Sequence, residues 1–500
     1  MRLSLRQRVG MNDDKTRRVA ARLLDRVSRG VDGFLSELEE TAPNELDALE
    51  LERAATNIIN ELGLGLMEAV FRRADEDAPE VVANGQRWGN RTLSEGKYTV
   101  KFGTFKLKRA GYQQAGRGKV MFPLDRRLGV VEGRYSPAMA RLMAWTIAEM
   151  PAERGAAYLE EVGLGAVSSS TLHRIPLDMA AVYEQNREAI EAVVRGEWRL
   201  PAGTHTVQVG MDGVMVPMDG EHAKPRGRKS EQRDVPRHER HYGPPPVGPS
   251  DDDGDDGAAY HEASVGTVSC FDAKLNHLGT VYLARMPEHR KETLAEGLEA
   301  ELSAILEENA GIQVAFASDG ARTHWEHLEG MEERLPEGVM SRQLLDFCHG
   351  AKYLFDAAKQ VEADEGEAHG LAGVWRSNLR HRKDGPQIVL RALRYQRDRA
   401  QRATARAELD TIINFFSDHH RNHRLDYKRA ENDAFPIGTG TTEAAAKTAV
   451  GVRMKRAGAR YDTHGGQTIL TFRAAVLSGR FDTTMREVVA RYRGEVKVAA

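Results

Sequence analysis

The segment from residue 206 to residue 360 constrains the fold most, because apolar strand-like stretches alternate in it with helical ones. The five apolar stretches are VQVGMDGVMVPM, ASVGTVSCF, HLGTVYLARM, IQVAFASDGA and MSRQLLDFCHG, and a helical stretch, KETLAEGLEAELSAIL, follows the third. Three successive strands followed by alternating helices and strands predict a mixed β-sheet with helices on its faces. The predicted class is therefore α/β, multidomain.

A segment from about 222 to 258 separates the first two predicted strands and is rich in proline, glycine and charge, including the acidic run DDDGDD. Too few apolar residues are present there to form a core, so we predict a disordered insert between the two strands.

The 500 residues are too many for one ordinary hydrophobic core, and a prior of about 150 residues per domain suggests roughly three or more units. We predict an N-terminal helical region at 1–80, a small β-hairpin unit at 81–135, a helical unit at 136–200, and a sheet domain at 201–500. The sheet domain contains a basic helical insertion at about 360–430. In the first region, apolar residues from Ile58 to Phe71, among them Ile59, Leu66 and Val70, predict a packed amphipathic helix.

Two stretches before residue 200 carry patterns that DNA-binding units share with many other proteins. Between Tyr98 and Tyr112, apolar residues alternate with lysines around a predicted turn at Gly103–Thr104, which indicates a basic hairpin. Its basic face could contact DNA phosphates, but by itself the pattern favours a solvated strand face. Later, a helix, a glycine-containing turn and a new helix capped by Ser168 fit a helix-turn-helix, as they fit other helical hairpins. If this unit binds DNA, the contacting residues are Ser169, Thr171 and Arg174.

The formal net charge of −3 is the sum of charges that are unevenly distributed along the chain. From Arg376 to Arg406 there are ten lysines and arginines against two aspartates, which predicts a local basic surface in which we single out Arg382 and Lys383. No apolar run is long enough to span a bilayer, and Cys270 and Cys348 cannot make a disulfide framework, so we expect a cytoplasmic, nucleoid-associated protein without a membrane partner.

Three acidic residues lie where a sheet could bring them together. Asp212 lies within an apolar strand, Asp319 ends another, and Glu443 lies in the helical stretch TTEAAAKTAVGVRMKRAG. Carboxylates at strand ends suit Mg²⁺, which prefers oxygen ligands, and a third carboxylate could complete a two-ion site for phosphodiester chemistry. An Asp-Gly pair is also common in turns, so each aspartate alone has a structural explanation.

The chain resembles the insertion-sequence transposases of the Kra group (the ISKra-four family), which are DDE transposases. The resemblance is most specific in PIGTGTTEAAAKTAVGVRMKRAGARY and the following GGQTILTFRAAVLSGRF. The upstream segments FPLDRRLGV, MDGV, SDGA and LDFCHGAKYL match in order, so it covers most of the chain from about Tyr98. It implies an RNase H-like catalytic domain in which Asp212, Asp319 and Glu443 are the catalytic and metal-binding acids, with two Mg²⁺ or Mn²⁺ ions.

Two departures from the family pattern bear on the predictions. Relatives often carry a Cys-x-x-Cys pair before the PLD segment, whereas this chain has GYQQAGRGKVMFPLD, so we expect no zinc. Tyr461 also replaces a usual tryptophan, a conservative change. All three acids are present.

Several further residues are candidates for contact with DNA. His349, after the fifth strand, is as readily explained by a structural role as by contact near the scissile phosphate. The basic residues after Glu443 could be a solvated face, but we favour contact with DNA phosphates for Lys447, Arg453, Lys455, Arg456 and Arg460. The histidines His419, His420 and His423 have spacing that could suit a metal, but adjacent arginines favour an exposed cationic turn instead.

The leading prediction is a transposase that cleaves DNA at the ends of its element and joins it to a target. The alternatives are a non-catalytic DNA-binding protein derived from a transposase and an RNase H-type nuclease that never joins ends. Because a transposase must hold two ends, we expect a homodimer or a larger assembly.

Overall fold

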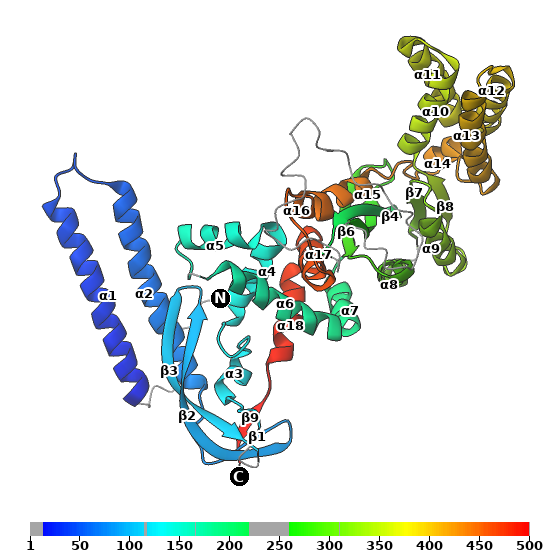
Figure 1. Cartoon of the computed structure of the whole chain (residues 1–500). Helices are drawn as coiled ribbons and strands as arrows, with labels where there is room; N and C mark the ends of the chain where they lie inside the picture. The colour runs from blue at the N-terminus through cyan, green and yellow to red at the C-terminus, as the bar shows by residue number, and fades with distance from the viewer. Residues whose placement is uncertain (1–13, 115–117, 166, 220–259, 310, 500) are drawn as a thin grey trace, which may run out of the picture. The chain divides into compact units, whose positions relative to one another are not determined.

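The computed structural model describes residues 14–114, 118–165, 167–219, 260–309 and 311–499. The chain forms two compact units, residues 1–191 with 482–500, and residues 192–481 (Figure 1). The sheet domain predicted at 201–500 differs from this division at its end, because the last strand, β9 (Val496–Val498), pairs with β1 (Val81–Ala83) in the first unit. The insert predicted at 222–258 lies outside the described residues.

The first unit contains a four-stranded antiparallel sheet in the order β3-β2-β1-β9. The long strands β2 (Gln86–Val100) and β3 (Gly103–Gln113) form the predicted hairpin, with Val100 opposite Gly103. The turn therefore lies at Lys101–Phe102, and the prediction of Gly103–Thr104 is wrong. Gly103 has a φ of +131°, which glycine adopts readily, and it begins the second strand.

Two helices of this unit pack against the hairpin, α2 (Ala48–Ala74) through aromatic contacts and α3 (Pro123–Leu128) through a buried ion pair. Tyr98 and Phe105 of the hairpin are buried against Phe71 of α2. Arg109 Nη1 lies 2.5 Å from Asp125 Oδ2, and the Tyr98 hydroxyl donates to Asp125 Oδ1 at 2.7 Å. Burial raises the pKa of Asp125, against the opposing effects of the Arg109 charge and the Tyr98 hydrogen bond. The aspartate of the FPLDRRLGV segment is thus an interior anchor.

The apolar residues of the N-terminal helices are only partly buried. Ile59, Leu66 and Val70 of α2 are exposed, as are Val31 and Leu35 of α1 (Asp14–Glu40). The prediction of a packed stripe from Ile58 to Phe71 is therefore wrong for those three α2 residues. Phe71 is the residue of that stripe that is fully buried, because it reaches the hairpin.

The remaining helices of the first unit follow the hairpin. Ser168 caps the third of the predicted helices, and its Oγ accepts from the Thr171 backbone N–H at 3.3 Å. The helices are α3 (Pro123–Leu128), α4 (Pro137–Glu149), α5 (Ala152–Glu161), α6 (Ser169–Gln185) and α7 (Arg187–Glu197), the last of which crosses the boundary between units, as does α18 (Phe481–Tyr492).

The second unit is built on a five-stranded mixed sheet in the order β6-β5-β4-β7-β8. The first three strands are antiparallel neighbours, and β7 and β8 run parallel to β4. This confirms the predicted mixed α/β sheet. Its strands are β4 (Thr206–Pro217), β5 (Tyr260–Phe271), β6 (His277–Arg285), β7 (Gln313–Ser318) and β8 (Ser341–Leu345).

Helices cover both faces of this sheet, and the alternation of side chains along β4 separates them. Val207, Val209 and Met211 form a core with α8 (Glu292–Glu308) and α9 (Arg322–Glu333). Val214 and Val216 point to the other face and pack against the segment that carries Glu443 and against α17 (Thr463–Leu477). That segment is not one regular α-helix: α15 (Gly440–Ala445) continues as a π-helical turn (Ala446–Gly451) and α16 (Val452–Met454).

Between β8 and α15 the chain forms a group of helices with its own core, the predicted helical insertion (Figure 1). Leu354, Trp375 and Phe416 are buried in it, and Ala315 and Leu344 of the sheet join the same core. The helices are α10 (Phe347–Val361), α11 (Glu365–His381), α12 (Gly385–Arg399), α13 (Ala403–Arg421) and α14 (Tyr427–Asn432). Within the described residues, no helix is both long and apolar enough to cross a membrane.

Candidate functional site

The register of the sheet brings Asp212 and Asp319 side by side. Gly210 of β4 pairs with Ala317 of the parallel strand β7, and each aspartate lies two residues further along its own strand direction. Side chains of directly paired residues in a sheet point to the same face, and alternate residues share it. The predicted juxtaposition of two strand-end carboxylates therefore follows from the hydrogen-bonding pattern.

The same strand positions the helix that carries Glu443. A side-chain carbon built on Gly210 would overlap Thr442 Oγ1, so the start of α15 packs directly against the backbone of β4. Thr442 Oγ1 is also 2.7 Å from Thr267 Oγ1 of β5. Glu443 is the next residue of α15, and this helix packs on the face of β4 to which positions 210 and 212 both belong.

Replacing Gly210 by alanine should destabilise the second unit by about 1–3 kcal/mol, because the new methyl group overlaps Thr442. Removing the Thr442 hydroxyl as well should recover part of that loss, so Gly210→Ala and Thr442→Ala should be non-additive. Thermal unfolding of the single and double variants measures this coupling. Gly370→Ala in α11, where an added carbon meets nothing within 4 Å, is the control; strictly additive losses would show that the contact does not hold the helix.

The two aspartates have opposite electrostatic environments. Burial raises the pKa of Asp212, and the Asp319 charge adds to that rise, although the Gly213 N–H donates to Asp212 Oδ1 at 2.7 Å. Burial also acts to raise the pKa of Asp319, but His324, the Ala321 N–H and His349 together lower it to about 2. The Asp319 charge thus disfavours ionisation of Asp212, and a divalent cation bound between the two carboxylates would stabilise both charges.

A buried chain of polar groups beneath Asp319 was not predicted from the sequence. Lys291 Nζ lies 3.1 Å from Glu262 Oε1 and 2.9 Å from His324 Nε2, and both Lys291 and His324 are buried. An ammonium group only donates, so His324 Nε2 accepts and Nδ1 carries the proton. Nδ1 faces Ser318 Oγ at 3.2 Å and Asp319 Oδ1 at 3.7 Å. This chain orients the imidazole toward the aspartate.

No periodic pattern could have revealed this arrangement. Lys291 was included in the predicted helical stretch, but it precedes α8 with a left-handed φ of 59°, and Arg290 before it has a φ of 47°. Such conformations are unfavourable for residues with side chains and concentrate at functional sites. The available signal was the spacing of His324 five residues after Asp319 in SDGARTH.

Glu443 is exposed and forms an ion pair with Lys447, with Nζ 2.7 Å from Oε1. In the part of the chain that the structure describes, no three His, Cys, Asp or Glu side chains are grouped so as to hold a metal ion. The structure thus brings Asp212 and Asp319 together, and it places the helix of Glu443 on the same strand with its carboxylate turned to a lysine. Lys447 is a neighbour of Glu443 rather than a free surface cation.

The first turn of α10 is tied to the segment that leads to Glu443. The Thr439 hydroxyl donates to Asp346 Oδ2 at 2.7 Å, and the Phe347 N–H donates to the Ile437 carbonyl at 3.0 Å. His349 lies in the same first turn of α10, with its ring 5.3 Å from the Tyr353 ring, and it contributes to the low pKa of Asp319. The predicted candidate His349 therefore lies within electrostatic reach of Asp319.

His419 is not part of an exposed cationic turn, and that prediction is wrong. It is 3% exposed, and its ring lies 4.6 Å from Phe415 and 6.0 Å from Trp325. Burial and the nearby Arg424 lower its pKa to about 4. His419 is therefore a neutral packing residue at neutral pH, whereas His423 is exposed as expected.

The stability of the second unit should fall as the pH decreases from about 6.5 to 4. His419 binds a proton in that window in the unfolded state but not in the folded state. Its contribution to the free energy of unfolding is therefore fully present above pH 6.5 and is about 3 kcal/mol smaller at pH 4. Urea unfolding across this range should show a shallower pH dependence for His419→Leu. The exposed His423→Asn serves as a control; equal slopes for all three proteins would contradict the burial of His419 as the cause.

The predicted phosphate contacts after Glu443 separate into surface and interior residues. Lys455 and Arg460 are exposed, and Arg456 is half-buried. Arg453 is 3% exposed, packs near the Tyr461 hydroxyl, and has a pKa lowered by burial. A DNA strand cannot reach a side chain buried in this way, so Arg453 is corrected to an interior residue.

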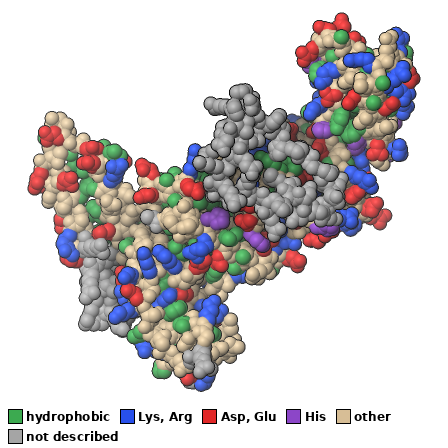
Figure 2. All heavy atoms as spheres, in the orientation of Figure 1, with side chains coloured by type: hydrophobic (Ala, Val, Ile, Leu, Met, Phe, Trp, Pro, Cys, Tyr) green, Lys and Arg blue, Asp and Glu red, His purple; other side chains and the backbone are tan. Residues whose placement is uncertain are grey.

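Many arginines of the helical insertion are paired with acids. Arg380 Nη2 lies 2.7 Å from Glu431, Arg382 Nε lies 3.1 Å from Asp384, and Arg397 contacts two aspartates. Figure 2 shows positive and negative side chains interspersed over this region rather than one uniform basic stripe. Lys383 is exposed.

In the first unit, the three predicted contacts of α6 differ in availability. Arg174 is exposed but forms an ion pair with Glu132. Ser169 and Thr171 are half-buried, and Thr171 takes part in the cap that Ser168 provides. These residues form the start of a helix, and their contacts are those of a helix cap.

Comparisons with known proteins add little to this geometry. No protein-family model matches the chain, and no curated protein matches it. Among solved structures, the chain is similar to one described as the Drosophila P element transposase strand transfer complex, with a TM-score of 0.23 and 11% sequence identity. That likeness covers 70% of this chain and 83% of the other, and a TM-score of this size carries no argument about fold or function.

Proposed function

We propose that the chain is a DDE transposase with an RNase H-like catalytic unit, which cleaves DNA at the ends of an insertion sequence and joins it to a target. The observation that carries the proposal is the register of β4 and β7, whose last pair, Gly210 and Ala317, lies two residues before Asp212 and Asp319, together with the electrostatic effect of Asp319 on Asp212. The contact of Gly210 with Thr442 supports it, because it brings the helix of Glu443 to the same strand.

Asp212 and Asp319 are the residues that would hold Mg²⁺ or Mn²⁺, with Glu443 as the third carboxylate. When bound, such ions supply activation of an attacking oxygen and stabilisation of a leaving oxygen on phosphorus. The chain's own residues prepare this site. Lys291 and Glu262 fix the His324 imidazole, which keeps Asp319 ionised, and Lys447 compensates the charge of Glu443 before the site is complete.

The test uses the full-length protein with Mg²⁺ and duplex DNA that carries the repeats flanking its gene. Products that are both cleaved and joined, and that disappear when the metal is chelated, are expected of a transposase. Cleavage without joining would favour the RNase H-type nuclease. DNA binding without any cleavage, with the true ends supplied, would favour the non-catalytic DNA-binding relative.

A further inference from the structure

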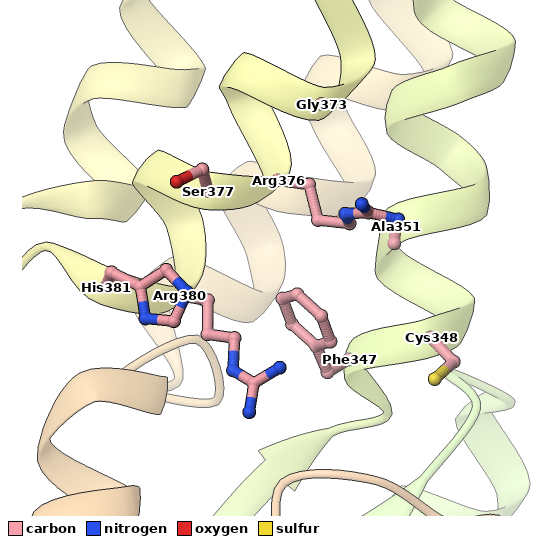
Figure 3. A pocket seen from close by; sticks show the side chains of 8 residues that line it. All are labelled: Phe347, Cys348, Ala351, Gly373, Arg376, Ser377, Arg380 and His381. Atoms are coloured by element: carbon pink, nitrogen blue, oxygen red, sulfur yellow. The ribbon is translucent and has the colours of Figure 1, made fainter. Parts of the chain in front are cut away.

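A pocket between α10 and α11 opens beside the segment that carries Glu443. Its volume is about 490 Å³, and the residues that matter for its chemistry are Phe347, Cys348, Arg376, Ser377, Arg380 and His381 (Figure 3). Phe347 is hydrogen-bonded through its backbone N–H to Ile437, three residues before Gly440 begins α15. One wall residue of the pocket is therefore hydrogen-bonded to the segment that leads into α15.

The charge in this pocket is positive and is not fully compensated. No acid lines it. Arg380 is held by Glu431, whereas Arg376 forms no hydrogen bond or ion pair with any residue that the structure describes. Burial, reinforced by the charges of Asp346 and Glu443, raises the pKa of the Cys348 thiol, which keeps that group neutral. An arginine with an unused planar fork of donors is suited to a phosphate group.

The aromatic side chain of the pocket argues against a nucleobase as the occupant. Phe347 is 9% exposed, its ring meets the edge of Tyr427 at 5.2 Å, and the Arg380 guanidinium lies 5.5 Å from its centroid. Both contacts occupy ring surface that a base would need for stacking. The available donor is instead the guanidinium of Arg376, whose geometry suits phosphate oxygens.

We propose that this pocket binds a backbone phosphodiester of the DNA substrate, with Arg376 as the principal contact. The inference rests on the proposed function, because it assigns a substrate contact next to Glu443. Arg376 would position the DNA, a role separate from that of the three proposed metal-binding acids. Loss of one phosphate contact should weaken DNA binding by about tenfold and reduce the salt dependence of binding by about one charge.

The chain carries a natural reporter for the pocket. It has two cysteines, of which Cys270 is buried and Cys348 is exposed in the pocket wall. Labelling of the full-length protein with a maleimide should therefore report on Cys348, and duplex DNA carrying the gene-flanking repeats should slow the reaction at concentrations that saturate binding by fluorescence anisotropy. A Cys348→Ser variant, which should not be labelled, confirms the site of reaction.

The matched variants are Arg376→Gln in the pocket and Arg391→Gln on α12, which is likewise exposed and does not line it. Arg376→Gln should need about tenfold more DNA for the same protection, and Arg391→Gln should behave as the original protein. DNA that binds without slowing the labelling, equal effects of the two variants, or full protection by inorganic phosphate alone would each overturn the inference.

These outcomes are separable from the fate of the proposed function. Cleaved and joined products without protection of Cys348 would leave the transposase proposal standing and refute the pocket. Protection that depends on Arg376, without any metal-dependent cleavage, would support the pocket as a DNA site and refute the catalytic proposal. Absence of DNA binding altogether would refute both.

Discussion

Replacing Asp319 by asparagine should reduce metal-dependent DNA cleavage by at least about a thousandfold while DNA binding persists. The substitution removes the charge of a carboxylate whose surroundings keep its pKa at about 2, so it is ionised throughout the neutral range. In the original protein the Ala321 N–H donates to Asp319 Oδ1 at 3.2 Å, and the amide oxygen of asparagine can accept the same hydrogen bond. The turn after β7 should therefore keep its shape, and cleavage and binding should be affected separately.

The matched control is Asp356→Asn in α10, which removes an exposed carboxylate paired with Lys359 at 2.7 Å. Surface ion pairs of this kind contribute about 1 kcal/mol or less, so cleavage, binding and stability should all remain near those of the original protein. Cleavage by Asp319→Asn within a few-fold of the original rate would exclude Asp319 as a metal-binding acid. Thermal unfolding of each variant verifies that the fold is retained.

The largest effect on stability is expected from Glu301→Gln in α8. Glu301 Oε1 lies 2.7 Å from Arg480 Nη1, and both side chains are 7% exposed, so loss of the negative charge leaves the Arg480 cation buried without it. Removing one partner of a buried ion pair costs about 3–5 kcal/mol, because the remaining buried charge loses the opposite charge with which it was paired. Urea unfolding followed by circular dichroism measures the difference.

The same helix supplies the comparison. Glu299 pairs with Arg334 at 2.5 Å, but these side chains are 36% and 58% exposed, so Glu299→Gln should cost no more than about 1 kcal/mol. Identical losses for the two variants would show that burial does not decide the contribution of the Glu301–Arg480 pair.

The strands and the two aspartates could be predicted from the sequence because local periodicity encodes them. Apolar alternation identified β4 to β8, and strand position identified Asp212 and Asp319. The sequence resemblance identified Glu443, whose catalytic role remains a prediction. The local pattern could not specify that Glu443 is turned toward Lys447, since that contact depends on side-chain packing.

The predictions that failed concern residues whose burial depends on parts of the chain outside their own helix. His419 and Arg453 carry groups that are usually exposed, and both are buried: His419 packs against Trp325 of α9, and Arg453 lies against Tyr461, which follows it by eight residues. Ile59 and Leu66 follow an apolar period, yet they are exposed because the hairpin covers a different side of α2. Periodicity predicts which residues share a face, and only packing determines which face is covered.

The sequence by itself determined the mixed sheet, the order of its strands along the chain, the cap at Ser168 and the identity of the candidate acids. Only the tertiary structure decided the alignment of β4 with β7, the contact of Gly210 with Thr442, the chain from Glu262 through Lys291 to His324, and the return of β9 to β1. The physical reason is the distance along the chain over which each kind of interaction acts. Hydrogen-bond register and close packing join residues separated by tens to hundreds of positions, whereas propensity and periodicity act within one element.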